Sequence, residues 1–254
     1  MSTQDQARLS NAENMIAAIA PMLRGLGHVA VGSQSPIPGS AALLAQALSG
    51  GTMRVSILGS REQNPFTDGG RELFDCAGQG RIDAFFLSGG QIDGAANINL
   101  VGTGDIETYP RHQQRFPGSF GSAYLYFVVP RVILFREEHT PRTLVRAVDF
   151  ISAPGTSAPE VYRPGGPHAL VTSRCVFSFD KPTARFTLLS VHPGVTVDEV
   201  RACTGFDYAV PPVVPQTPAP DASTLALLRG EIAQMVAKTY PAFASKTWGN
   251  SIAQ

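Results

Sequence analysis

The sequence contains few charged residues and no excess of either sign. Charged side chains make up 16% of the 254 residues, and 20 basic residues are balanced by 20 acidic ones. A chain with zero formal net charge has no long-range field that would collect nucleic acid or an anionic membrane surface. We therefore expect neither nucleic acid nor a membrane as a partner.

Cysteine is also scarce, and long apolar runs are missing. Cys76, Cys175 and Cys203 lie far apart, so they provide neither a disulfide framework nor the closely spaced ligands of a zinc site. Residues 1–9 are polar and do not resemble a signal peptide. The most apolar segment, residues 124–135, is too short to cross a bilayer. We expect a cytoplasmic protein that binds no metal.

The first half of the chain alternates predicted helices and strands. Hydrophobic residues make up 43% of the sequence, which is enough to form a sizeable core. The predicted helices are residues 11–24, 41–48 and 69–79, and the predicted strands are residues 28–32, 53–58 and 82–87. This alternation is typical of βαβ units, in which a helix connects two parallel strands.

The second half is richer in short strands. We predict β-like runs at residues 132–135, 147–151, 169–171, 176–179 and 186–191. A helix should follow Thr196, which forms a capping box with Glu199. Residues 209–220 are rich in proline and are predicted to form an extended arm, followed by a helix over residues 221–238. We predict a single domain over residues 1–254 of class α/β, with a partly parallel central sheet, flanking helices and a β-rich second half.

Three loops that follow predicted strands are candidates for chemistry, because ligands of open parallel sheets bind beyond the carboxyl ends of the strands. Residues 31–40 could hold an anion at the start of a helix or simply form a capped turn. Residues 88–99 combine glycines with a carboxylate and two amides. Residues 115–122 could present backbone N–H groups to a thioester carbonyl or form a plain turn.

Two histidines outside these loops have simpler interpretations. His192 precedes a Pro-Gly turn, and a structural role is favoured over a catalytic one. His168 follows Gly165, Gly166 and Pro167, and we interpret it as an exposed turn residue.

In their order along the chain, these segments resemble the B-type chains of glutaconate-type class I coenzyme A transferases. The similar segments are VAVGSQSPIPGSAALLAQAL, FFLSGGQIDGAANINLVGTGD, RFPGSFGSA, VDFISAPG, HALVTSRCVFSF and VHPGVTVDEVRACTGFDY. The resemblance implies the coenzyme A transferase fold (NagB/RpiA-like) and a partner chain of the A type, in a heterodimer or heterotetramer. It implies that a coenzyme A thioester binds as substrate where the two chains meet, with no bound cofactor.

The resemblance also implies which residues contact the acyl-CoA substrate. These predicted binding residues are Gly32, Ser33, Gly59, Gly89, Gly90, Gln91, Asp93, Asn97, Asn99, Gly118, Ser119, Phe120 and Gly121.

One residue departs from the pattern of the transferases. In that family a glutamate at the end of a strand of the B-type chain attacks the thioester and forms covalent intermediates. Ile57 occupies the matching position here, and its side chain cannot act as a nucleophile. Ser56 and Glu62 are weak substitutes, because Ser56 should point to the opposite face and Glu62 should lie in a surface loop. Phe120 stands where the family has glycine, and its ring either narrows the acyl pocket or simply packs.

Three functions are compatible with this pattern. The first is a subunit of an acyl-CoA enzyme that works by hydrolysis, carbon–carbon cleavage or decarboxylation through acid–base chemistry, with residues supplied partly by the A-type chain. The second is a coenzyme A transferase in which Glu62 or a partner residue supplies the carboxylate. The third is a non-catalytic scaffold or regulatory subunit.

Overall fold

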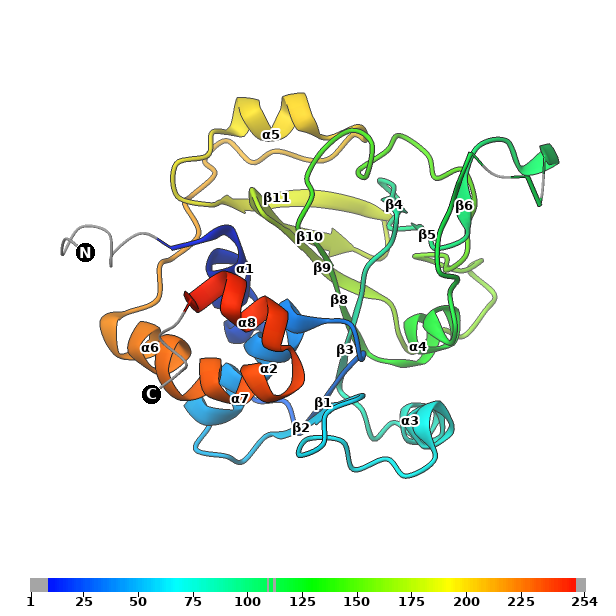
Figure 1. The fold of residues 1–254 in the computed structure, drawn as a ribbon. Coiled ribbons are helices and arrows are strands. Elements are labelled where there is room, and N and C mark those ends of the chain that lie inside the picture. Colours follow the sequence, from blue (N-terminus) through cyan, green and yellow to red (C-terminus); the bar gives the residue numbers. More distant parts are fainter. Residues whose placement is uncertain (1–8, 109, 112, 250–254) are drawn as a thin grey trace. The chain divides into compact units, whose positions relative to one another are not determined.

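The computed structural model describes residues 9–249 except residues 109 and 112 (Figure 1). Its contacts divide the chain into two compact units, one formed by residues 1–65 and 218–254 and the other by residues 66–217. Within the described residues, no helix has the length and apolar character needed to span a bilayer.

The first unit contains two parallel strands and helices from both ends of the chain. Strands β1 (His28–Val31) and β2 (Arg54–Ile57) pair in parallel, with Val31 opposite Ile57. The helices are α1 (Asn11–Ile19), the 3₁₀ turn η1 (Ala20–Leu23), α2 (Pro36–Leu48), α6 (Ala222–Leu227), the π-helical turn η3 (Leu228–Ile232), α7 (Ala233–Thr239) and α8 (Pro241–Trp248). Helix α2 packs on β1 and β2 and also on α1, α7 and η3, so the last helices of the chain pack on the helix that contacts the first two strands.

Helix α2 begins earlier than the predicted helix over residues 41–48. It starts at Pro36, whose fixed φ suits the first helical turn and whose missing N–H has no partner to lose there. Ser40 therefore lies inside the helix, where its hydroxyl donates to the carbonyl of Pro36 at 2.8 Å, and it is not the cap. The expected helix at the amino terminus is confirmed, with its last turn in the 3₁₀ conformation.

The buried Glu13 connects the two ends of the chain within this unit. It is 3% exposed, and its carboxylate accepts hydrogen bonds from Arg229 Nε at 2.7 Å and Nη2 at 3.1 Å. Trp248 Nε1 donates to the same carboxylate at 3.3 Å. The ion pair with Arg229 stabilises the ionised form and holds the pKa of Glu13 below its ordinary value, although burial opposes this.

The second unit contains a mixed sheet with a parallel part and an antiparallel part. Strands β3 (Ala84–Leu87), β8 (Arg131–Arg136) and β9 (Pro167–Thr172) pair in parallel, and β10 (Cys175–Asp180) and β11 (Arg185–Val191) continue the sheet in antiparallel order. Its helices are α3 (Gly69–Gly78), α4 (Ser122–Val128), α5 (Val197–Cys203) and the 3₁₀ turn η2 (Ile106–Thr108). The unit also contains two small antiparallel ribbons. One pairs β4 (Gln91–Ile92) with β5 (Ile98–Asn99), and the other pairs β6 (Gly102–Thr103) with β7 (Gln114–Arg115). The predicted α/β class with a largely parallel core sheet is confirmed.

Local sequence signals in the second half are mostly reproduced. The capping box of Thr196 and Glu199 starts α5, and in the other unit Asp221 caps α6. Residues 147–151 form no strand, because Val148 N and Asp149 N donate to side chains of the β4–β5 ribbon instead of to a sheet. His168 is exposed as expected but lies in β9 and not in a turn.

Residues 209–217 run along the outer edge of β11. Ala209 forms a parallel bridge with Thr187, and Gln216 forms another with Val191. Thr217 N donates to the carbonyl of Val191 at 2.7 Å. The proline-rich segment thus covers backbone groups of an edge strand that would otherwise be open to pairing with another chain.

Two buried histidines connect β9 with neighbouring segments of this unit. His139 is 3% exposed, and its ring nitrogens lie 2.7 Å from Thr172 Oγ1 and 2.9 Å from Thr204 Oγ1. His192 Nε2 donates to the carbonyl of Thr172 at 2.8 Å, and Nδ1 lies 2.9 Å from Thr217 Oγ1. The structural role predicted for His192 is confirmed by these contacts.

Burial makes both imidazoles resist protonation. Desolvation, assisted by the positive charge of Arg174, lowers the pKa of His139 from 6.5 to about 4. Desolvation also lowers the pKa of His192. In the unfolded chain these rings take up protons near pH 6.5, whereas in the folded chain they stay neutral. The stability that His139 contributes is therefore present above pH 6.5 and is lost as the pH falls toward 4.

When the pH is lowered from about 7.5 to about 5, we expect the free energy of unfolding to fall by about 2 kcal/mol because of His139 alone. Urea unfolding at a series of pH values measures this change. His139→Gln should be less stable at the higher pH but should show a flatter pH dependence. His168→Gln, at an exposed position, should keep most of the dependence found in the unchanged protein. If the free energy of unfolding of His139→Gln depended on pH as steeply as that of the unchanged protein, His139 would not be the source of the dependence.

Candidate active site

Predicted binding residues from two segments lie together at the carboxyl ends of β1 and β2. Leu58 N donates to the carbonyl of Val31 at 3.0 Å, so the turns that follow the two strands lie side by side. Gly59 has a φ of +83°, and a Cβ atom at this residue would lie 3.4 Å from the Cβ of Ser33. The structure thus places the predicted residues Gly32, Ser33 and Gly59 at one end of this strand pair, as expected for parallel strands.

Ile57 packs into the interior of its unit. Its side chain is 1% exposed, and its Cδ1 lies 3.7 Å from the position that a Cβ atom of Gly39 in α2 would occupy. Its backbone N–H donates to the carbonyl of Gln63 at 2.9 Å, which closes the turn after β2. At this position the chain offers a buried hydrocarbon where the resemblance implies a reactive carboxylate.

Ser56 points to the other face of β2 and is fully buried. Its Oγ lies 2.8 Å from Nε2 of His28, a residue that is 8% exposed. The register of β1 and β2 is regular here, so no bulge turns Ser56 toward the position of Ile57. Ser56 therefore cannot replace the glutamate in the same place.

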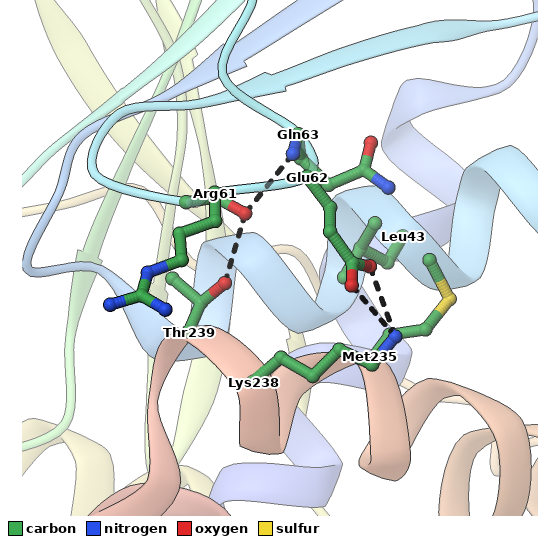
Figure 2. Close-up of a pocket in the computed structure, with 8 residues that line it drawn as sticks. Leu43, Arg61, Glu62, Gln63, Met235, Lys238 and Thr239 are labelled. Atoms are coloured by element: carbon green, nitrogen blue, oxygen red, sulfur yellow. Dashed lines mark hydrogen bonds and ion pairs between the residues drawn. The ribbon is translucent and has the colours of Figure 1, made fainter.

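Glu62 lies in a pocket of about 240 Å³ next to the turn after β2 (Figure 2). Its carboxylate oxygens lie 2.9 and 3.1 Å from Nζ of Lys238, and both side chains are more than half exposed. An exposed ion pair of this kind contributes at most ~1 kcal/mol. The pocket is lined by Leu43, Ser60, Arg61, Glu62, Gln63, Met235, Lys238 and Thr239.

Two hydrogen bonds of Ser60 connect segments that line this pocket. Ser60 Oγ accepts from Gln63 N at 3.1 Å and lies 3.0 Å from Thr239 Oγ1. The loop that carries Glu62 is thereby tied to the end of α7. Of the two weak candidates, Glu62 is the one whose carboxylate is accessible, and its location in the predicted surface loop is confirmed.

In the second unit, the two glycines after β3 lie against side chains of the chain itself. A Cβ atom at Gly89 would overlap Ile98, and one at Gly90 would overlap the ring of Phe116. The close approach that glycine permits is thus used here for internal packing. Phe116, which sequence reasoning did not single out, lies over Gly90 from the third candidate segment.

Asp93 and Asn97 hold the turn of the β4–β5 ribbon and two segments beyond it. Asp93 Oδ1 accepts from the N–H groups of Ala95 and Asn97, each at 3.0 Å, and Oδ2 accepts from Asn97 Nδ2 at 3.1 Å and Val148 N at 3.4 Å. Asn97 Oδ1 accepts from Gly155 N at 3.0 Å. These side chains support the fold in addition to any role toward a ligand.

Gln91 and Asn99 form a second set of contacts across the same ribbon. Asn99 Nδ2 donates to Gln91 Oε1 at 2.7 Å, and Asp149 N donates to the same oxygen at 3.0 Å. Asn99 Oδ1 accepts from Val101 N at 3.0 Å, while its Nδ2 also donates to the carbonyl of Gly102 at 2.7 Å. The four polar residues predicted for this loop therefore form two hydrogen-bonded pairs, Asp93 with Asn97 and Gln91 with Asn99.

The third segment lies next to the second and exposes an aromatic ring. Gly118 N donates to the carbonyl of Leu100 at 2.9 Å, which sets the two segments side by side. Phe120 has a φ of +46°, a left-handed conformation that is rare for a bulky residue, and its side chain is 84% exposed. Its ring centroid lies 5.5 Å from that of Phe74 in α3. Ser119 and Gly121 flank this ring in the sequence, just before the start of α4.

Two further observations concern possible chemistry elsewhere. In the part of the chain that the structure describes, no three His, Cys, Asp or Glu side chains come together as a metal ion would require. Cys175 is fully buried, and burial raises the pKa of its thiol to about 12, so it is not a reactive thiolate.

Comparison with known families and sequences gives a consistent result. A family model described as coenzyme A transferase matches residues 9–202. The B-type chain of glutaconate CoA-transferase from Acidaminococcus fermentans is 30% identical over 58% of this chain and 56% of its own length. The B-type chain of 3-oxoadipate CoA-transferase from Pseudomonas knackmussii is 33% identical over 59% and 58%. The cholesterol ring-cleaving hydrolase IpdB subunit of Rhodococcus jostii is 32% identical over 55% and 54%.

Solved structures extend the similarity over more of the chain. The crystal structure of IpdAB from Rhodococcus jostii RHA1 matches with a TM-score of 0.77 and 25% identity, covering 88% of this chain and 94% of that one. The decarboxylase AibA/AibB matches with a TM-score of 0.75 and 21% identity, covering 95% and 100%, which shows a shared fold. The sequence matches, by contrast, span less than two thirds of the length of each curated relative.

We expect Asp93→Ala to lower the free energy of unfolding by about 2–4 kcal/mol, because it leaves several N–H donors without their buried acceptor. Chemical denaturation measures the change. Asp75→Ala, at an exposed helical position, should change the stability by less than about 0.5 kcal/mol. Equal effects of the two substitutions would show that Asp93 does not hold the ribbon.

Proposed function

Because this chain belongs to the coenzyme A transferase family, we propose that it is the B-type subunit of a two-chain enzyme that processes a coenzyme A thioester without a covalent glutamyl intermediate. The reaction is hydrolysis, carbon–carbon cleavage or decarboxylation of the acyl group by acid–base chemistry. An A-type subunit of the same family is the partner and supplies part of the catalytic groups.

The observation that carries this proposal is the burial of Ile57. A nucleophilic carboxylate must reach the thioester carbon, but the side chain at this position is hydrocarbon and packs toward Gly39 of α2. Ser56 is committed to His28 on the opposite face. The related hydrolase subunit and the decarboxylase of the same fold are consistent with a family member that does not transfer coenzyme A.

Coenzyme A transfer with a substitute carboxylate is the second candidate. Glu62 favours it, because its carboxylate is accessible in a pocket close to the end of β2. Two relatives with comparable identity are named as transferase subunits. Against it, Glu62 lies beyond the turn that follows the strand, and its carboxylate forms an ion pair with Lys238.

The products of one probe distinguish the reactions. We expect the enzyme assembled with its A-type partner to convert glutaconyl-CoA either to free coenzyme A thiol, as in hydrolysis, or to carbon dioxide with the thioester retained, as in decarboxylation. Glu62→Gln should change this rate by less than about twofold, as should the exposed control Glu231→Gln. Formation of acetyl-CoA when acetate is added, lost by more than about 100-fold in Glu62→Gln alone, would favour the transferase instead.

Phe120 provides a second test within the proposed function. A strained backbone that holds an aromatic ring in solvent points to a contact with another molecule, which we assign to the acyl-CoA. We expect Phe120→Ala to raise the KM for the thioester by about tenfold or more, since burying a phenyl ring contributes ~1.5–3 kcal/mol. Tyr162→Ala, which removes a similarly exposed ring, should leave KM unchanged. Equal KM values for both variants would exclude this role of Phe120.

A further inference from the structure

Two basic side chains, those of Arg163 and Lys181, lie against Gly166 at the amino end of β9. A Cβ atom at Gly166, whose φ is +137°, would lie 3.6 Å from Arg163 Nε and 3.5 Å from Lys181 Cε. His168 follows two residues later, as the second residue of β9. This group is called here the Gly166 cluster: Arg163, His168 and Lys181.

Arg163 is held rigidly in this cluster. Its guanidinium carbon lies 5.1 Å from the ring centroid of Tyr126 and 5.7 Å from that of Phe127. Nη2 donates to the carbonyl of Tyr126 at 3.0 Å, and Nη1 donates to Ser157 Oγ at 3.4 Å. Its Nε is buried and has no partner among the described residues. A half-buried cation with an unsatisfied donor is costly unless negative charge lies nearby.

The charge of Arg163 acts on Lys181, and the charge of Lys181 acts on His168. Lys181 Nζ donates to a neutral group, the carbonyl of Pro130, at 3.5 Å. Burial and the charge of Arg163 lower the pKa of Lys181. Burial lowers the pKa of His168, and the charges of Arg131 and Lys181 add to this effect. These mutual repulsions are what an anion bound between the side chains would relieve.

No carboxylate in the described part of the chain forms an ion pair with Arg163 or Lys181. The neighbouring carboxylate of Asp180 is turned to Thr183, whose N–H donates to it at 3.2 Å and whose hydroxyl also contacts it. Although the protein has zero formal net charge, positive charge is therefore in excess around Arg163 and Lys181.

We propose that the Gly166 cluster is a binding site for a phosphate group, either inorganic phosphate or a phosphate monoester. Nη1 and Nη2 of Arg163 each carry one N–H beyond the hydrogen bonds described above. These N–H groups, the ammonium of Lys181 and the imidazole of His168 are the donors that the proposed site offers to phosphate oxygens. Because β3 and β9 run parallel with β8 between them, this site at the start of β9 lies away from Gly89 and Gly90, which follow the end of β3. It is therefore separate from Gly89 and Gly90, which are expected to contact the acyl-CoA.

Site-resolved titration tests this proposal independently of any acyl-CoA chemistry. The full chain is titrated with inorganic phosphate at constant ionic strength, balanced with sodium chloride, while the amide resonances of Gly165 and Gly166 are followed by NMR. We expect saturable shifts of both amides. The double variant Lys181→Gln/His168→Gln should bind phosphate at least about tenfold more weakly. A parallel titration with ribose 5-phosphate shows whether the site also accepts the ester.

The control is Arg185→Gln, which removes an exposed positive charge from the start of β11 outside the cluster. It should bind phosphate as the unchanged protein does. Both substituted side chains of the double variant are exposed, so its amide spectrum should otherwise be preserved. The proposal is overturned if neither phosphate species causes saturable shifts, or if the double variant binds as tightly as the control.

Discussion

Adjacent residues of a β-strand point to opposite faces, and this alternation along β2 decides what the end of that strand can do. The parallel register with β1 places Ser56 on the face of His28, where the two side chains share a hydrogen bond of 2.8 Å. It places Ile57 on the face of α2, where its Cδ1 lies 3.7 Å from the position that a Cβ atom of Gly39 would occupy. A carboxylate in place of Ile57 would face this apolar contact, so the hydrocarbon is the residue that suits the packing.

The second unit meets a different constraint, since its candidate binding loop must also support the surrounding loops. The polar side chains of this loop form hydrogen bonds with segments up to 58 residues away in sequence. They belong to Gln91, Asp93, Asn97 and Asn99. Residues 147–151 form no strand, and the N–H groups of Val148 and Asp149 find their partners in these side chains. The same amides and carboxylate that suggest a ligand site are therefore required by the fold, and their presence alone is weak support for binding.

Much of the fold follows from local signals in the sequence. The capping box at Thr196 and the alternating helices and strands predict elements that the structure contains. Local signals failed where a distant side chain took over a backbone group, as at Val148 and Asp149, and where proline began a helix earlier, at Pro36. A single domain over residues 1–254 remains a prediction. The contacts within the chain divide it into two compact units.

For the candidate site, order along the chain was more informative than any single residue. It identified the family and the substitution at Ile57, whereas the strained exposure of Phe120, the ring of Phe116 over Gly90 and the pocket beside Glu62 required coordinates. These features depend on φ angles and on contacts between distant segments, which leave no periodic pattern in a sequence. The cluster around Gly166 is of the same kind, because its members come from separate segments of the chain.

The central claim is that no carboxylate of this chain forms a covalent bond with coenzyme A during turnover. The most direct measurement is peptide mass spectrometry of the chain after incubation of the two-chain enzyme with glutaconyl-CoA and reduction with borohydride, which would convert a glutamyl thioester to an alcohol. The account predicts that every Glu-containing peptide of this chain keeps its original mass while the probe is consumed. A reduced residue at Glu62 would contradict it.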